Sequence, residues 1–563
     1  MKKSFGLTLS TLFVASVLAA CGGNDGNNSN DDGAGNVNDS DNTNENGGNE
    51  EAADQTPSGD QTLIFARGGD SVSLDYASVT DGESSRVTKQ IFESLLEFDD
   101  DSFEIGPGLA HDWDVSDDGL TYTFHLREGV QFHDGTDFNA DAVKINFERW
   151  ADPDHEYHFA DEGYTYSVYG TQFGGFAGDD GHVIEEIVVV DDYTVEFNLN
   201  EQLGSFIQNM GMSYFAITSP ASFEEYGPAI NENPVGTGPF EFVSWTRDDS
   251  IELVKNENYW MEDYPKLDRV IFQVIPDNSA RLTALRSGEI DIMDGLNPDD
   301  VDMIEMEDGL TVFERTANNI GYLGFNMEKE PFDNQLVRQA LNHAVNKEAL
   351  NTILYADLAE HAKNIIPPSY LGYNDDVEEY SYDPDRAREL LAEAGYNDDL
   401  EFDLWTMPVA RPYMPDPESA AEVLQQDFAN VGVTANIVTH EWATYLELTE
   451  QGEQDVFMLG WSGTNGDPDY FFGNLLHGDA IPGGNRTFYS NDEVNTLLDQ
   501  AKISVDEAVR ADLYEQAQLL IHDDAPMIPL VHTRPVLAGS ERVMNYVPHP
   551  STSESLTFVE LAE

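Results

Sequence analysis

The sequence predicts a mixed α/β fold with at least two lobes, on three observations. The chain from Gln61 to Glu563 is far longer than one hydrophobic core usually supports. Apolar and polar residues alternate in some segments, as in half-buried strands, and apolar residues recur at helical spacing in others. These two kinds of segment are interleaved along the chain, and we find no internal repeat.

The strands are predicted by short apolar runs that end at turn residues. Leu63–Ala66 stops at Gly68-Gly69, and Val270–Ile275 stops at Pro276. Residues 121–126 alternate apolar and polar side chains and predict a half-buried strand. Further strands are predicted at 187–190 and 194–198, joined as a hairpin at Asp191-Asp192, and at 433–439.

Three helices are predicted by their apolar stripes and end signals. Residues 336–345 carry apolar side chains at helical spacing. A second helix starts at Asp383-Pro384, continues to Ala394 and stops at Gly395. A third is predicted over residues 420–431.

The N-terminus predicts an exported protein with a lipid anchor. Lys2 and Lys3 precede an apolar run from Leu7 to Ala20, which is short for a membrane span and has the proportions of a signal peptide. The run ends at Cys21, the only cysteine of the chain, behind two alanines. This pattern resembles a bacterial lipoprotein signal, in which residues 1–20 are removed and Cys21 is diacylated. The alternative is an incidental free thiol; either way no disulfide is expected.

Residues 22–60 predict a spacer. Ten of them are acidic and none is basic, and Asn and Gly fill most of the rest. Such a segment cannot bury enough apolar surface to offset its ordering entropy, so we predict a disordered tether with a reach of roughly 35 Å. An acidic metal-binding tail is the alternative.

The formal net charge of −80 excludes some partners. Nucleic acid is not expected as a partner, because phosphate would be repelled. Acidity spread along the whole chain is typical of adaptation to a salty medium, which screens self-repulsion, and an alkaline habitat fits as well. The charge therefore describes the habitat more than the chemistry.

Several motifs follow one another along the chain. They are Gly108-Leu109-Ala110, Trp113, Ser116-Asp117-Asp118-Gly119, Tyr122–Arg127, Phe132-His133-Asp134-Gly135, Asn139–Val143, Pro234–Phe240, Val337–Leu341, Ala344–Lys347 and Gly460-Trp461. In this order and spacing they resemble the family 5 extracellular solute-binding proteins, which serve importers of peptides, nickel and related solutes. Within that family the dipeptide- and oligopeptide-binding branch is the most similar, through Leu404–Tyr413, Thr439–Trp442 and Asn465–Asp469.

The resemblance implies a two-lobed periplasmic-binding-protein fold, the Venus flytrap of the large peptide-binding type, with mixed sheets and a two-strand hinge. The first lobe is expected to contain residues 61–273 and 532–563, and the second residues 274–531. The chain would then cross the hinge near Gln273–Pro276 and near Leu530–Thr533, which permits the lobes to rotate.

Arg411 is the first candidate ligand-binding residue. Its guanidinium can pair with a carboxylate through two parallel hydrogen bonds, and the resemblance implies that this position binds the C-terminus of a peptide. A surface salt bridge is the alternative. Tyr413, Trp442 and Trp461 are candidates for the walls of the site, because aromatic faces accept varied side chains; ordinary core packing is their alternative.

The loop from Gly463 through Thr464 to Asp467 departs from the pattern of the resemblance. Peptide-binding relatives usually carry an aspartate at the position of Thr464, where it pairs with the amino group of the ligand. A hydroxyl provides no counter-charge, so either Asp467 or another acid moves in, or the ligand lacks a free amine there. Asp467 is alternatively a turn residue beside Pro468. Gly68 and Gly69 are expected to border the cleft or to form a plain turn.

The sequence therefore predicts a lipid-anchored binding protein on the outer face of the cell membrane. It would capture short peptides and deliver them to ABC permease subunits with a separate ATPase, because the chain has no nucleotide-binding motif. We expect a monomer without cofactor, metal or nucleic acid; the histidines do not have metal-site spacing. A non-peptide ligand, such as an oligosaccharide, nickel chelate or other carboxylated solute, is one alternative, and a secreted hydrolase is another. No nucleophile motif supports the hydrolase.

Overall fold

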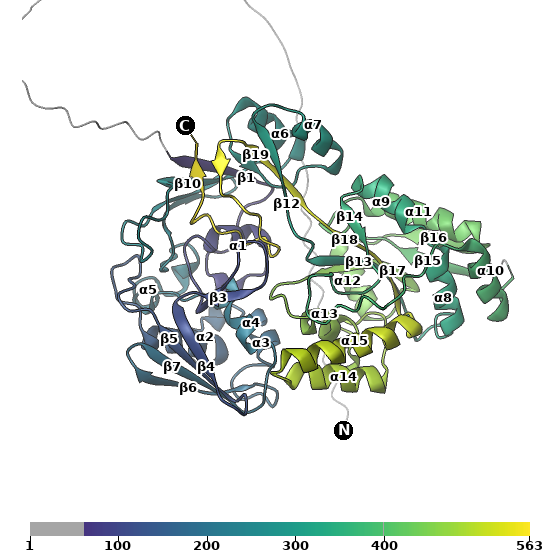
Figure 1. The fold of residues 1–563 in the computed structure, drawn as a ribbon, viewed down its shortest axis with the longest axis horizontal. Coiled ribbons are helices and arrows are strands. Elements are labelled where there is room, and N and C mark those ends of the chain that lie inside the picture. Colours follow the sequence, from purple (N-terminus) through teal and green to yellow (C-terminus); the bar gives the residue numbers. More distant parts are fainter. Residues whose placement is uncertain (1–60, 398, 563) are drawn as a thin grey trace, which may run out of the picture. The chain divides into compact units, whose positions relative to one another are not determined.

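The computed structural model describes residues 61–397 and 399–562. The signal segment, Cys21 and the acidic tether lie outside the described residues. The predicted mixed α/β class is confirmed, and each predicted strand and helix is present (Figure 1).

A seven-stranded sheet contains the first strand of the described chain. Its order is β12 (Leu310–Glu314), β19 (Val536–Ser540), β11 (Ile292–Met293), β1 (Thr62–Arg67), β10 (Arg269–Val274), β9 (Ser250–Lys255) and β8 (Phe240–Thr246). β1 runs parallel to β10 and β11, and the other pairs are antiparallel. Leu63 and Phe65 pack in a core on one face, whereas Ala66 packs in another, as alternation along a strand requires.

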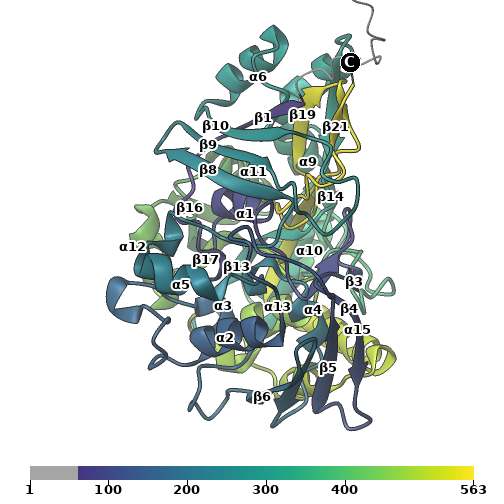
Figure 2. The same ribbon diagram turned by 90° about the vertical axis from the view of Figure 1, so that its left-hand side faces the viewer.

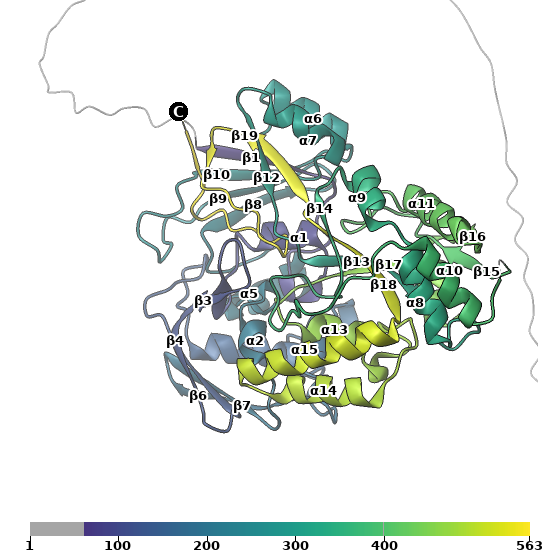
Figure 3. The ribbon, with the colours of Figure 1, turned by 45° about the vertical axis from the view of Figure 1, so that its right-hand side comes forward.

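A six-stranded sheet is formed by later residues. Its order is β14 (Ala359–His361), β18 (Met527–Thr533), β13 (Asn319–Phe325), β17 (Val456–Ser462), β15 (Glu401–Trp405) and β16 (Thr434–Val438). β13 is buried throughout, because it has a partner on each side and lies inside its own hydrophobic core. Figures 1 and 3 show helices along this sheet, with α14 (Asp492–Ile503) and α15 (Glu507–Asp524) side by side.

A four-stranded antiparallel sheet has a third core. Its order is β4 (Ala110–Val115), β5 (Thr121–Leu126), β7 (Thr194–Leu199) and β6 (Ile184–Asp191). Figure 2 shows β10, β9 and β8 at the top of the view and this sheet at the bottom. Two small hairpins complete the strands: β2 (Leu96–Phe98) with β3 (Ile105–Pro107), and β20 (Val543–Met544) with β21 (Glu560–Leu561).

The helices of the first half are α1 (Gly82–Thr88), α2 (Ala140–Ala151), α3 (Ser167–Gln172), α4 (Phe206–Met210), α5 (Pro220–Tyr226), α6 (Asn278–Ser287) and α7 (Val301–Glu305). Those of the second half are α8 (Gln335–Ala344), α9 (Lys347–Tyr355), α10 (Pro384–Glu393), α11 (Pro417–Asn430), α12 (Trp442–Glu450), α13 (Asp469–Leu475), α14 (Asp492–Ile503) and α15 (Glu507–Asp524). Short 3-10 helices lie at Tyr76–Ser78, Ala160–Glu162, Ser213–Phe215, Gly227–Asn231, Pro298–Asp300 and Gly478–Ala480.

Side-chain caps explain where several helices start. Asp383 accepts a hydrogen bond from the N–H of Arg386 and precedes a proline, as the sequence predicts for α10. Asp416 and Pro417 do the same for α11, which therefore begins three residues before the predicted apolar stripe.

The two large sheets are joined by two short connections. Residues 315–318 lead from β12 to β13, and residues 534–535 lead from β18 to β19. The connections lie against each other, because Arg315 N–H donates to the carbonyl of Pro535 at 3.0 Å. In the described part of the chain, no helix combines the length and the apolar character that crossing a membrane requires.

Candidate functional site

A cavity of about 850 Å³ is lined by segments of both large sheets and by the connections between them. This volume lies within the range of small-molecule sites. The lining comes from the start of α1, from α6, from residues 294–298, 315–319, 355–358, 410–415, 462–464 and 533–536, and from the C-terminal loop 550–552. Three of the predicted ligand-binding residues are among them, namely Arg411, Gly463 and Thr464.

Arg411 lies in the loop between β15 and α11. Its backbone N–H and carbonyl bond reciprocally with those of Met414, at 3.0 and 2.8 Å, and hold the loop in a tight turn. The guanidinium carbon lies 4.5 Å from the centre of the Trp442 ring, within cation–π distance. Arg411 interacts with the Tyr413 hydroxyl but forms no ion pair with any residue of 61–397 or 399–562. It therefore offers the cavity an uncompensated positive charge.

Tyr413 contacts Arg411 through its hydroxyl and is not among the residues that line the cavity. Its ring is buried against the backbone of Gly460, where any side chain would collide with it. Burial raises the pKa of Tyr413 to about 12, although the charge of Arg411 opposes that shift. The hydroxyl therefore stays protonated beside the guanidinium.

The two candidate tryptophans lie beside the cavity and not among its lining residues. Trp442 begins α12, stacks on Tyr445 at 5.8 Å and carries Arg411 on its ring. Trp461 lies in β17 and packs against Tyr470 at 5.6 Å. Trp442 thus positions a lining residue, whereas Trp461 packs against Tyr470 of α13.

Gly463 is enclosed so tightly that only glycine fits. Its N–H donates to the carbonyl of Asn318 at 2.9 Å, and the side chain of Asn318 donates back to the Gly463 carbonyl at 2.8 Å. A Cβ atom at Gly463 would collide with the Tyr370 hydroxyl and with the side chain of Asn318, which are hydrogen-bonded to each other. The loop is therefore fixed to the connection that precedes β13.

Thr464 lines the cavity with an unused hydroxyl. Its Oγ1 atom is buried and makes no hydrogen bond to the described residues. Burial raises the pKa of Tyr470 and the Thr464 hydroxyl lowers it, so the two groups lie near each other without good bonding geometry. Because Oγ1 is buried, the position offers a ligand neither a charge nor an exposed hydroxyl oxygen.

Asp467 is engaged away from the cavity. Both of its carboxylate oxygens lie 2.7 Å from Nη2 of the buried Arg510, and Oδ1 also accepts from the N–H of Asp469. The preceding Asn465 donates to Asn209 at 3.0 Å and to Gln172 at 3.3 Å. This arrangement favours a structural role for Asp467, which ties the turn to Arg510.

Gly68 and Gly69 form the turn after β1 and lie next to residues that line the cavity. A Cβ on Gly68 would touch the side chain of Arg281, and one on Gly69 would touch Glu83; both neighbours line the cavity. The turn is held by the buried Arg67, which bonds to Asp70 at 3.2 Å. The structure therefore gives these glycines a supporting position.

Sequence reasoning missed a buried ion network at the cavity wall. Arg86 bonds to Asp294 at 2.9 Å and to Glu83 at 3.3 Å, and Glu554 lies between Arg86 and Arg315. Burial raises the pKa of Asp294, but Arg86 and Arg315 lower it further, so the carboxylate stays charged. The scarcity of basic residues was the signal that could have identified these arginines, since the chain has only 27 lysines and arginines.

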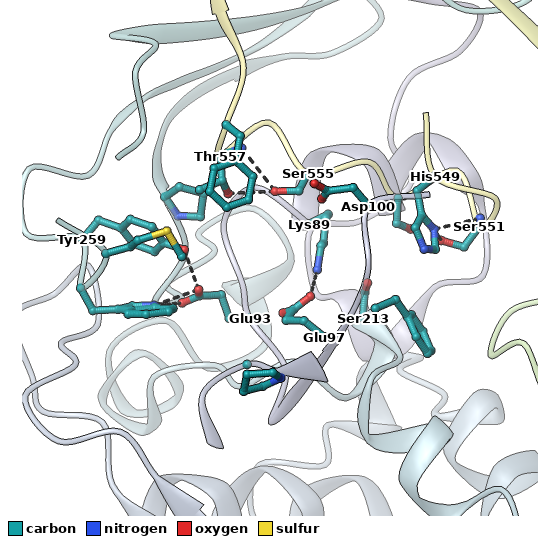
Figure 4. Close-up of a pocket in the computed structure, with 18 residues that line it drawn as sticks. Lys89, Glu93, Glu97, Asp100, Ser213, Tyr259, His549, Ser551, Ser555 and Thr557 are labelled. Atoms are coloured by element: carbon teal, nitrogen blue, oxygen red, sulfur yellow. Dashed lines mark hydrogen bonds and ion pairs between the residues drawn. The ribbon is translucent and has the colours of Figure 1, made fainter. Parts of the chain in front are cut away.

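A second, smaller cavity of about 180 Å³ surrounds Glu93 (Figure 4). Glu93 accepts hydrogen bonds from Thr237 and Tyr259 at 2.8 Å and from Trp260 Nε1 at 2.9 and 3.1 Å. Burial without a cation at bonding distance raises its pKa to about 7. The nearby Lys89 is paired with Glu97. In the described part of the chain, no group of three His, Cys, Asp or Glu residues is placed to hold a metal ion.

Comparison with known proteins supports the predicted family. Residues 104–483 match the sequence profile of the bacterial extracellular solute-binding proteins, family 5 Middle. Heme-binding protein A of Haemophilus influenzae is 38% identical over 88% of this chain and 91% of its own length. The dipeptide-binding protein of Escherichia coli is 37% identical over 87% of this chain and 92% of its own length.

Among solved structures, the periplasmic binding protein DppA from Helicobacter pylori, in complex with the peptide STSA, is similar, with a TM-score of 0.74 and 36% identity. The match covers 89% of this chain and 98% of that one. The predicted fold of the peptide-binding type is thereby confirmed. This chain belongs to family 5 of the bacterial extracellular solute-binding proteins, which are transport binding proteins and not enzymes.

Proposed function

We propose that this protein captures short peptides outside the cell and delivers them to the permease of an ABC importer. The observation that carries the proposal is Arg411, a cation that lines the cavity without a carboxylate partner among the described residues. A peptide C-terminus is a carboxylate that fits a guanidinium fork. The relatives named for dipeptides and the solved complex with a peptide support the same ligand class.

Closure of two lobes around the ligand is the proposed mechanism of capture. β11 and β12 belong to the same sheet as β1, so we propose that the first lobe extends to Glu314 and resumes at Val536. The expected crossing near Gln273–Pro276 would then move to residues 315–318, and the second crossing to residues 534–535. Ligand that touches both lobes stabilises the closed form, which the permease then recognises.

Binding experiments with unmodified peptides test this function. Native mass spectrometry of the purified protein would identify a ligand that co-purifies, and calorimetry with di-, tri- and tetrapeptides in high salt would measure affinity. We expect stoichiometric binding of at least one length class. If every peptide fails to bind while a sugar or a metal chelate binds, the peptide assignment is wrong.

A carboxylated solute that is not a peptide is the second candidate. The observation that favours it is Thr464, which lines the cavity without a charge, whereas an amino group buried there would need an anion. One relative that is 38% identical is named for heme, so relatives of similar identity differ in the ligand that their names give. The co-purified ligand would decide between the two candidates.

We also propose that Cys21 carries a lipid that holds the protein on the outer face of the cell membrane. The apolar run before this sole cysteine supports the proposal. Replacement Cys21→Ser should release the protein from the membrane fraction into the medium. Continued membrane association of that variant would contradict the anchor.

A further inference from the structure

The charged residues that line the large cavity have the opposite balance to the chain as a whole. The sequence has 107 acidic and 27 basic residues. The cavity, in contrast, is lined by five arginines and two acids, which are Arg86, Arg281, Arg315, Arg411, Arg534, Glu83 and Asp294. Three of these arginines have acidic partners, because Glu554 pairs with Arg86 and Arg315, and Arg534 lies near Glu314 and Glu360. Arg281 and Arg411 are the lining cations without an ion pair among the described residues.

Both acids of the lining are already paired within the protein. Arg86 bonds to Asp294 through Nη2 at 2.9 Å and to Glu83 through Nη1 at 3.3 Å. The other oxygen of Asp294 accepts the N–H of Gly295 at 2.9 Å. Each carboxylate of the lining therefore already has a cationic partner in the protein.

Two of the five arginines, in contrast, have no carboxylate partner in the described residues. Arg411 forms no ion pair there, and the acceptors of the Arg281 hydrogen bonds are neutral, including the Asp294 carbonyl at 2.9 Å. The buried Arg315 is paired with Glu554. Arg534 forms long ion pairs with Glu314 and Glu360, at 3.6 and 3.9 Å.

The remaining polar groups of the lining are hydroxyls, side-chain amides and backbone carbonyls. They accept hydrogen bonds from an ammonium group but do not balance its charge, and burial of an unbalanced charge is costly. A ligand carboxylate, by comparison, can pair with an arginine that has no carboxylate partner in the described residues.

We infer that the cavity selects solutes that carry carboxylates and no free amine, so that an N-acylated peptide is the form in which a peptide binds. This inference rests on the proposed solute-binding function and narrows its ligand class. It assigns recognition to the acid end of the ligand and leaves the other end to neutral contacts.

Four forms of one dipeptide test the inference by calorimetry on the full chain. Alanyl-phenylalanine is compared with its N-acetyl derivative, its C-terminal amide and the doubly blocked form. We expect the N-acetyl form to bind at least about five-fold more tightly than the free peptide, and the amide to bind at least about ten-fold more weakly. Arg388→Ala, which removes an exposed arginine of α10, should leave all four affinities unchanged.

The outcomes separate this inference from the proposed function. If acetylation weakens binding, or tightens it less than about five-fold, the cavity accommodates the amine and the inference is wrong, while peptide capture stands. If no form binds, peptide capture is wrong, and the preference for carboxylates over amines is tested alone by comparing the rise in melting temperature with glutarate and with 4-aminobutyrate. A larger rise in melting temperature with glutarate supports the inference. An equal or smaller rise, or no rise with either compound, overturns it.

Discussion

The guanidinium carbon of Arg411 lies 4.5 Å from the ring centre of Trp442. The ring lies against the cation, and Arg411 also lines the cavity. A cation held in this way loses little conformational freedom when it pairs with a carboxylate. The pair therefore forms a preorganised anion site.

Arg411→Ala should remove this site. We expect affinity for a peptide with a free C-terminal carboxylate to fall about 30- to 100-fold, which corresponds to a charge-assisted pair of about 2–3 kcal/mol. Affinity for the C-terminal amide should change little, and Arg411→Lys should recover only part of the loss because it lacks the fork. Calorimetry measures both series. Equal losses for the acid and the amide would remove the clamp role.

Thr464→Asp should change which ligands bind. The new carboxylate would lie in the cavity wall and supply the counter-charge that a ligand amine lacks. We expect the ratio of affinities for free and N-acetylated peptide to shift toward the free peptide by about ten-fold or more. The isosteric Thr464→Val should leave that ratio unchanged. No shift in the aspartate variant would place the amino end elsewhere.

Gly463→Ala should destabilise the protein, because a Cβ there collides with Tyr370 and Asn318. We expect a loss of about 2–4 kcal/mol in the free energy of unfolding, measured by urea denaturation. Adding Tyr370→Phe removes one of the colliding groups and should recover part of the loss. Gly483→Ala is the matched control, since its Cβ would meet only the Ala480 carbonyl at 3.7 Å. Equal effects at both glycines would contradict the tight enclosure.

Asp467→Asn tests whether this acid is structural. The substitution leaves the buried Arg510 without its counter-charge, so we expect a loss of about 3 kcal/mol in the free energy of unfolding. The exposed Asp479→Asn should cost little. The preference between free and N-acetylated peptide should stay as in the unaltered protein. A selective loss of affinity for the free peptide would instead make Asp467 the amine partner.

Glu93→Gln should change how stability depends on pH. Native Glu93 keeps its proton up to about pH 7, whereas an unfolded glutamate loses it near 4.5. The unfolded state therefore binds fewer protons in this window, and Glu93 lowers the free energy of unfolding as pH rises through it. Gln can keep these contacts, because the Thr237 hydroxyl, which donates to Glu93, can turn and accept from the NH₂ group instead.

Relative to the unaltered protein, Glu93→Gln should gain about 3 kcal/mol between pH 4.5 and about 7. Urea denaturation across this window measures the gain, and the shared titration of other groups cancels in the difference. The exposed Glu104→Gln should show no such trend. Parallel curves for Glu93→Gln and the unaltered protein would mean that native Glu93 is already ionised.

Local sequence signals predicted the elements well, and they failed where structure depends on distant partners. β5 was predicted from its alternation, but β4 was not, because most of its side chains are exposed and show no apolar pattern. The four-stranded sheet with its own core was therefore missed. Asp416-Pro417 was an available start signal for α11 that the apolar stripe alone did not use.

The candidate site also contains residues that local motifs predicted and residues whose partners are distant in the sequence. Arg411, Gly463 and Thr464 belong to short motifs, and all three line the cavity. The network of Arg86 and Glu554 joins residues 468 positions apart, so no local pattern could pair them. Asp467 lies in a motif too, but its partner Arg510 is fixed by the packing of α15 against the loop.

The position of β19 constrains the order in which the protein can fold as it is made. β19 lies between β12 and β11, although it is among the last strands of the chain. Until residue 540 is available, β12 has no partner in the sheet and β11 has an open edge. Open strand edges invite association between chains, so the early half must be protected from aggregation until synthesis is nearly complete. A chain that stops before residue 536 cannot close this sheet at all.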